Sequence, residues 1–264
     1  MRVRIVDAFT DQAFAGNPAA VCFLDGADWP DADWMQRVAA ELNMPMTAFA
    51  LPRGDDWGLR WFTPLIEERL CGHATLATAF LLGGDRPLRF HTRAGVLSAT
   101  VAGDGAVTLD FPAADVAARG PIGGLDEALG AAPAELHGTG ELRDVLAVFD
   151  DEAAVRRLAP RMDALADVCR REDIRGVVAT AAGGEHDFVS RFFSPADGLP
   201  EDPVTGSAHC ALAPFWARRL GSARLVGHQV SARGGVVRTE LAGDRVLLTG
   251  HAVVVLDGEL TAAG

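Results

Sequence analysis

The chain has 264 residues, 49% hydrophobic and 23% charged, which suits a globular protein of one large or two medium domains. Its formal net charge of −12 argues against a nucleic-acid partner or an anionic membrane surface, because both attract clustered Lys and Arg side chains. The chain contains no lysine, which excludes Schiff-base chemistry, pyridoxal-phosphate enzymes and the Walker P-loop.

Hydrophobic spacing predicts mixed strands and helices in the first half of the chain. The apolar positions from Trp34 to Leu42 predict a helix over residues 31–43, and Cys71 begins a second helix that runs to about Leu82. Strands are expected around these helices at residues 3–9, 19–24, 47–51, 58–63, 89–91, 95–101 and 106–111.

The second half shows a similar order of predicted elements. A helical stretch over residues 151–169 is expected to break near Pro160, and a later helix contains the apolar run 208–216. Strands are expected at residues 143–149, 176–180, 187–193, 229–231, 235–241 and 245–250.

Four short segments recur in the same order in both halves, which predicts an internal duplication. The pairs are Arg60–Pro64 with Arg191–Pro195, Cys71–Ala74 with Thr205–Ala208, Arg93–Leu97 with Arg233–Val237, and Ala102–Asp104 with Ala242–Asp244. We therefore expect domains over residues 1–115 and 116–264, with terminal strands able to cross between them. Two like domains would direct both glycine-opened helix starts at one cleft, where unpaired N–H groups suit a carboxylate or phosphate.

The turn after Asp202 is the most informative stretch. Pro203 fixes the backbone and keeps Asp202 extended, outside any helix. Gly206 lets a ligand approach the backbone closely, and Ser207 or Thr205 can cap the helix that follows. Asp202 is then a candidate acid or base beside an anion pocket.

Cysteine and histidine patterns indicate neither a metal site nor a disulfide framework. The four cysteines form no C-x-x-C pair, and the seven histidines lack ligand spacing, so we expect no metal and reduced thiols. The first residues lack the apolar core of a secretion signal, and no apolar run is long enough to span a bilayer. A cytoplasmic location is the resulting expectation.

These motifs resemble those of the PhzF-like phenazine-biosynthesis isomerases. The first is Arg60–Pro64 followed by Leu70–Ala77, and the second is Ser190–Pro195 followed by Pro200–Ala211. Three further stretches also fit, at Asp7–Phe9, Gly16–Val21 and Ser231–Gly235.

The resemblance implies an α+β fold of the diaminopimelate-epimerase type. Two similar domains, each a curled, mostly antiparallel sheet around a central helix, are related by a pseudo-twofold axis with the active site between them. The resemblance also implies a homodimeric enzyme of secondary metabolism. Its reaction would be a proton transfer that needs no cofactor. The small carboxylated substrate would be dihydro-hydroxyanthranilate-like or a bulkier relative.

The chain departs from the family pattern Asn-Leu-Ser-Glu-Thr-Ala-Phe, whose Glu shuttles the proton. Met46 stands at the position of that Glu, and a thioether carries no proton at neutral pH. The remaining catalytic candidates are His73, with an ordinary pKa near 6.5, Asp202 as base or as orienter of His73, and Cys71 as a thiolate at a helix start. Met46 also indicates a more apolar cleft and a different substrate.

We expect the substrate to be bound by six further residues, namely Asn17, Gly72, Thr205, Gly206, Ser207 and Arg233. Two alternatives to the isomerase stay open. One is an amino-acid racemase or epimerase that uses Cys71 with a non-thiol partner, since Thr205 stands where the related epimerases carry a second Cys. The other is a non-catalytic homologue that only binds a small molecule.

Overall fold

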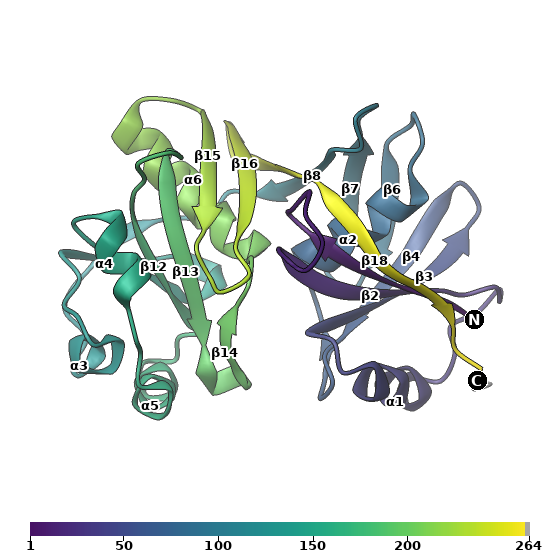
Figure 1. The fold of residues 1–264 in the computed structure, drawn as a ribbon, viewed down its shortest axis with the longest axis horizontal. Coiled ribbons are helices and arrows are strands. Elements are labelled where there is room, and N and C mark those ends of the chain that lie inside the picture. The colour runs from purple at the N-terminus through teal and green to yellow at the C-terminus, as the bar shows by residue number, and fades with distance from the viewer. Residues whose placement is uncertain (262–264) are drawn as a thin grey trace. The chain divides into compact units, whose positions relative to one another are not determined.

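The computed structural model describes residues 1–261 and consists of two compact units (Figure 1). The first unit contains Met1–Asp110 and the segment that begins at Thr249, and the second contains Phe111–Leu248. The chain thus enters the second unit within one strand, β8 (Val107–Pro112), and leaves it within another, β17 (Arg245–Gly250).

The first unit is a sheet of mixed direction with two helices. Its elements are β1 (Arg2–Ala8), β2 (Asn17–Phe23), α1 (Ala32–Leu42), β3 (Met46–Arg53), β4 (Asp56–Phe62), β5 (Glu67–Glu68), α2 (Gly72–Leu82), β6 (Leu88–Thr92), β7 (Gly95–Val101), the start of β8, and β18 (Ala252–Glu259). The pairs β2–β3 and β4–β6 are parallel. The pairs β1–β18, β1–β2, β3–β4, β4–β5, β6–β7 and β7–β8 are antiparallel.

The second unit repeats this order. Its elements are β9 (Ala117–Arg119), α3 (Leu125–Leu129), β10 (Glu135–Gly138), the 3-10 helix η1 (Gly140–Leu142), β11 (Asp144–Val148), α4 (Glu152–Arg157), α5 (Met162–Glu172), β12 (Gly176–Ala182), β13 (Phe188–Ser194), the 3-10 helix η2 (Pro195–Asp197), β14 (Leu199–Asp202), α6 (Gly206–Leu220), β15 (Arg224–Gln229), β16 (Gly235–Ala242) and most of β17.

The two units have corresponding strand connections. Helices α4 and α5 connect the parallel pair β11–β12, as α1 connects β2–β3. Helix α6 connects the parallel pair β13–β15, as α2 connects β4–β6. The predicted duplication is therefore visible in the topology as well as in the motifs.

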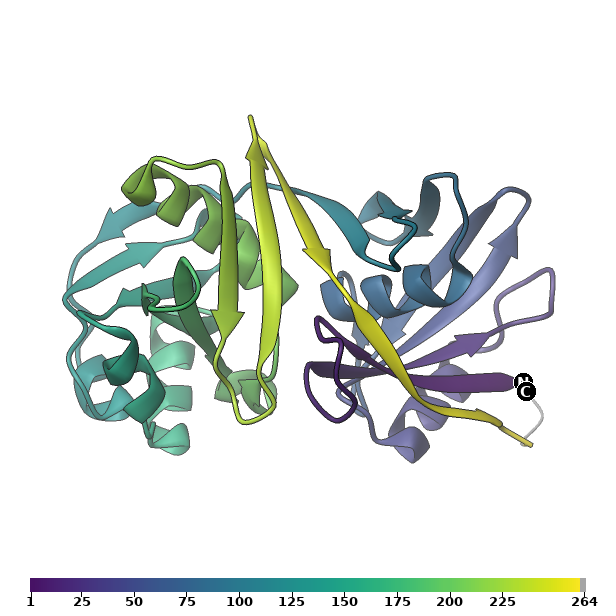
Figure 2. The same ribbon diagram turned by 45° about the horizontal axis from the view of Figure 1, so that its top comes forward.

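The central helices α2 and α6 are apolar on nearly all sides, which is the composition of a buried helix. Helix α2 contacts β1, β2, β3, β7 and β18, so the sheet wraps around it. Helix α6 packs in a core with residues of β11, β12, β13 and β15, in which Phe188 stacks on Trp216 at 6.0 Å. The view in Figure 2 shows both helices alongside their strands.

An arginine–glutamate pair recurs in each unit beside the central helix. Arg60 donates to Glu67 at 2.7 and 2.8 Å, and Arg191 donates to Glu201 at 2.7 and 2.9 Å. Each pair ties a long strand (β4 or β13) to the short strand (β5 or β14) that precedes the central helix. These bidentate bonds hold the segments leading into the two helix starts.

Local signals placed several boundaries correctly. Helix α1 is capped by Asp31, which accepts from the N–H groups of Asp33 and Trp34 at 2.9 and 3.3 Å. The helical stretch over residues 151–169 is interrupted around Pro160, because α4 ends at Arg157 and α5 begins at Met162.

One strand prediction is wrong, and several strands were not predicted. The strand expected over residues 229–231 is wrong, because β15 ends at Gln229 and a turn follows in which Gly234 has φ +66°. Strands β5, β9, β10, β14 and β18 were not predicted; β18 pairs antiparallel with β1, and Arg2 lies opposite Glu259. Within residues 1–261, no helix combines the length and apolar character that a bilayer span requires.

Candidate active site

The first helix start lies at Cys71–His73 in the first unit. Gly72 is the first residue of α2, and Cys71 precedes it in extended conformation. The Cys71 Sγ lies 3.4 Å from the His73 Nδ1, and both side chains are buried. A thiol and an imidazole therefore contact each other where the unpaired N–H groups of α2 begin.

Burial changes the chemistry expected of His73. It lowers the pKa of His73 to about 3, because the protonated ring would lose its hydration. The assumption of an ordinary pKa near 6.5 is therefore wrong, and the ring is neutral at pH 7. A neutral imidazole at this place acts through hydrogen bonding, unless an anion bound beside it favours the charged form.

The starts of β2 and β3 carry two more predicted residues. Asn17 is the first residue of β2 and Met46 the first of β3, and the parallel register pairs Ala19 with Met46. Both side chains are buried. The thioether of Met46 thus occupies the position where the family resemblance places a carboxylate.

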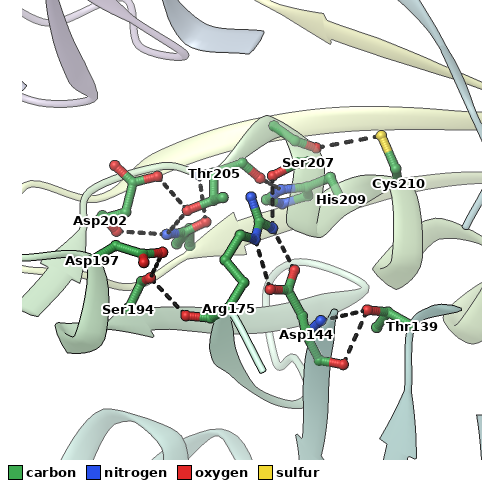
Figure 3. Close-up of polar contacts among 12 residues, drawn as sticks. Thr139, Asp144, Arg175, Ser194, Asp197, Asp202, Thr205, Ser207, His209 and Cys210 are labelled. Atoms are coloured by element: carbon green, nitrogen blue, oxygen red, sulfur yellow. Dashed lines mark hydrogen bonds and ion pairs between the residues drawn. The ribbon is translucent and has the colours of Figure 1, made fainter. Parts of the chain in front are cut away.

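The second helix start lies at Thr205–Ser207 in the second unit, after Asp202 ends β14 (Figure 3). The Thr205 hydroxyl donates to the Asp202 Oδ2 at 2.5 Å instead of capping α6, so the capping role proposed for its side chain is wrong. Gln229 donates to the Asp202 carbonyl at 2.7 Å and accepts from the Thr205 N–H at 2.9 Å. These bonds fix a buried carboxylate at the mouth of the helix.

His209 supports the same turn from inside α6. Its Nδ1 donates to the Thr205 carbonyl at 2.8 Å, which assigns the proton to Nδ1 because a carbonyl only accepts. Burial lowers the pKa of His209 to about 4, so this ring is also neutral at pH 7.

Ser207 is the second residue of α6 and does not cap the helix; its hydroxyl accepts from Arg175 Nη2 at 3.0 Å. Arg175 also donates from Nε to Asp144 at 2.8 Å, and Nη2 bonds the other oxygen of that carboxylate. Burial acts to lower the pKa of Arg175, but the hydrogen bonds and charge of Asp144, with smaller contributions from Asp202 and Asp197, raise it.

Sequence reasoning missed Arg175, Asp144 and Gln229. One signal was available, since Arg175 immediately precedes one predicted strand and Asp144 lies near the start of another. Polar side chains at the starts of neighbouring parallel strands lie at the same edge of a sheet.

Arg233 lies in the turn between β15 and β16, which is tied to the Asp202 turn. The Ser231 hydroxyl donates to the Pro203 carbonyl at 2.8 Å and accepts from the Gly234 N–H at 3.1 Å. The second unit therefore brings Asp202, Thr205, Ser207 and the Arg233 turn together. Across residues 1–261, no group of three or more His, Cys, Asp or Glu side chains is arranged to hold a metal ion.

The sequence pattern of the family described as phenazine biosynthesis-like protein matches residues 6–258. This chain belongs to that family. An uncharacterized isomerase of Pseudomonas aeruginosa is 47% identical over 97% of this chain and 96% of its own length. The crystal structure of a phenazine biosynthesis protein of the PhzF family from Enterococcus faecalis superposes with a TM-score of 0.92 at 39% identity, covering 99% of both chains.

A more distant structure extends the comparison of the fold alone. A probable proline racemase from Agrobacterium radiobacter has a TM-score of 0.64 at 13% identity, over 99% of this chain and 93% of that one. The predicted diaminopimelate-epimerase-like fold and the assignment to PhzF-like isomerases are thus confirmed, as is the enzyme class.

Proposed function

We propose that this protein is a cofactor-independent isomerase that moves a proton on a small carboxylated metabolite, with Asp202 as its acid–base residue and His73 as a hydrogen-bond donor to the substrate. One observation carries the proposal. The Asp202 carboxylate is buried at the mouth of α6 and oriented by the Thr205 hydroxyl at 2.5 Å. A carboxylate held in one orientation is what proton abstraction from carbon requires.

The proposed reaction conserves atoms and oxidation state. Asp202 accepts a proton from one carbon of the substrate, and its carboxylic acid returns a proton to another carbon as the double bonds shift. Neutral His73 donates a hydrogen bond that stabilises the charge developing on the substrate. Neither role calls upon Met46.

Charge around both helix starts supports a carboxylated substrate. Neither α2 nor α6 has an acidic residue in its first turn, so no carboxylate of that turn repels an anion bound at the helix start. Met46 removes a further carboxylate that would repel such a ligand. Its apolar side chain favours a substrate with an apolar ring or chain beside the carboxylate.

Deuterium exchange tests the proposal directly. The protein is incubated in D₂O with trans-2,3-dihydro-3-hydroxyanthranilate, and carbon-bound deuterium is followed by NMR. We expect exchange in the native protein and its loss in Asp202→Asn. Asp197→Asn is the matched control, because Asp197 also accepts from a hydroxyl, that of Ser194 at 2.9 Å, yet has no proposed acid–base role. Equal exchange in Asp202→Asn and the native protein would exclude Asp202 as the base.

Substitution of Met46 separates an altered enzyme from a binding homologue. If the chain is an enzyme adapted to another substrate, Met46→Glu lowers its existing exchange activity, because a buried charge enters an apolar site. If the chain only binds its ligand, the native protein shows no exchange with any binder, and Met46→Glu gains it. Thermal unfolding of the variant checks that the new carboxylate leaves the first unit folded.

A racemase is the second candidate, favoured by the 3.4 Å contact between the Cys71 Sγ and the His73 Nδ1. If a carboxylate bound beside His73 favours its charged form, the imidazole accepts the thiol proton and leaves a thiolate able to remove an α-proton. Exchange of α-hydrogens would be measured with a panel of L-amino acids in D₂O. Exchange that disappears in Cys71→Ser supports this candidate, and absence of exchange across the panel removes it.

A further inference from the structure

Arg175 reaches the second helix start from outside the recognised motifs. It precedes β12, and its Nη2 donates both to the Ser207 hydroxyl at 3.0 Å and to Asp144 (Figure 3). Asp144 is buried, and the guanidinium lies 5.1 Å from the ring centre of Phe192. The side chain is therefore held in one position by a buried counter-ion and an aromatic face.

A comparison with Arg191 shows that Arg175 has donors left over. Arg191 uses Nε and Nη2 on Glu201 and Nη1 on the carbonyls of Val155 and Leu158, and its side chain is 12% exposed. For Arg175 Nη1, no partner is found among residues 1–261, and the side chain is 30% exposed. Two N–H bonds of Arg175 are thus available on a rigidly placed group.

The same contact sets the direction of the Ser207 hydroxyl. Its oxygen accepts from Arg175, so its single proton is directed away from the guanidinium, toward another acceptor. The Ser207 O–H and the Arg175 Nη1 then offer adjacent donors beside the first N–H groups of α6. A carboxylate accepts such paired donors with both of its oxygens.

We propose that Arg175 and Ser207 form the pair that binds the carboxylate of the substrate. The inference rests on the proposed function, and it assigns Arg175 a binding role in which Asp144 is the positioning residue. Because Asp144 balances the charge of Arg175, recognition depends on hydrogen-bond geometry more than on net charge.

The internal repeat shows that this pair belongs to the second unit alone. Gly176 pairs with Asp144 at the start of β12, as Met46 pairs with Ala19 at the start of β3. The first-unit counterpart of Arg175 is therefore Pro45, which offers no hydrogen-bond donor. The proposed carboxylate-binding pair is therefore present only in the second unit, although the strand connections occur in both units.

A pair of ligands that differ only at the carboxyl group tests the proposal. Binding of 3-hydroxyanthranilate and of its uncharged amide is measured by calorimetry for the native protein and for Arg175→Lys. Lysine can still neutralise Asp144 but lacks the planar fork. We expect the native protein to prefer the carboxylate about tenfold or more, and Arg175→Lys to lose most of that preference with the amide affinity unchanged.

Two further variants keep the test decisive. Arg191→Lys removes an equally anchored fork from β13, and we expect it to keep the carboxylate preference whatever it does to thermal stability. Ser207→Ala removes the hydroxyl while Asp144 stays paired, so it serves even if Arg175→Lys fails to fold, with an expected loss of about fivefold in carboxylate affinity. No preference in the native protein, or a preference that survives Ser207→Ala and any folded Arg175→Lys, would overturn the assignment.

The outcome is distinguishable from failure of the isomerase proposal. If Arg175→Lys and Ser207→Ala lose the carboxylate preference while Asp202→Asn exchanges deuterium undiminished, the carboxylate-binding pair is supported and Asp202 is excluded as the base. If Asp202→Asn loses exchange while Arg175→Lys and Ser207→Ala leave the ligand preference unchanged, Asp202 is supported as the base and the carboxylate-binding pair is excluded.

Discussion

Removal of the Thr205 hydroxyl is the sharpest test of how the second helix start works. Thr205→Val keeps the shape of the side chain and deletes the bond to Asp202 Oδ2 at 2.5 Å, along with the weaker bond from Gln229 Nε2 at 3.2 Å. Gln229 retains its bond to the Asp202 carbonyl at 2.7 Å. The substitution therefore isolates the orientation of one carboxylate.

The expected magnitude follows from these contacts. A hydrogen bond to a buried charged group contributes about 1.5–3 kcal/mol, and the partly compensated Gln229 bond adds less, so we expect the free energy of unfolding to fall by about 2–3 kcal/mol. A carboxylate that loses its fixed orientation should exchange deuterium about 10- to 100-fold more slowly. Thr205→Ser, which restores a hydroxyl, should recover most of both losses.

Thr180→Val is the matched control, because the Thr180 hydroxyl is also buried and doubly bonded. It donates to the Val189 carbonyl at 2.7 Å and accepts from the Trp216 Nε1 at 3.0 Å, and neither bond involves Asp202. Urea denaturation followed by circular dichroism gives stability, and NMR gives exchange. If Thr205→Val slows exchange no more than Thr180→Val at equal loss of stability, the orienting role of Thr205 is refuted.

Two other predictions concern stability of the second unit. Burial lowers the pKa of His209 to about 4, whereas the unfolded residue titrates near 6.5, so the unfolded chain binds the proton first as pH falls. Stability is then lost between about pH 6.5 and 4, by up to about 3 kcal/mol, and His209→Gln should flatten this decline in urea titrations; an unchanged slope would exclude His209 as its source. At Gly227, an added Cβ would lie 2.4 Å from the Phe188 ring, so Gly227→Ala should cost about 1–3 kcal/mol, whereas Gly103→Ala, with nothing within 4 Å, should leave the denaturation midpoint unchanged. Equal midpoints for the two alanine variants would show that the Phe188 ring yields without cost.

Local chemistry made much of the fold predictable from the sequence. Several local signals act within a few residues, so their effect can be predicted from the sequence alone. They are the cap at Asp31, the break around Pro160 and the glycines that begin α2 and α6. The duplication was predictable for a different reason. Four repeated motifs keep their order, and the structure gives them corresponding strand connections.

The properties that set the chemistry of the site depend on residues far apart in the chain. The sequence identified the two helix starts, the turn after Asp202 and the thioether at Met46. Only the tertiary structure decided that His73 is buried and neutral, that Thr205 binds Asp202 instead of capping α6, and that Arg175 reaches Ser207 across 32 positions. Burial and long-range hydrogen bonds arise when distant segments pack together, and no local pattern of residues encodes them.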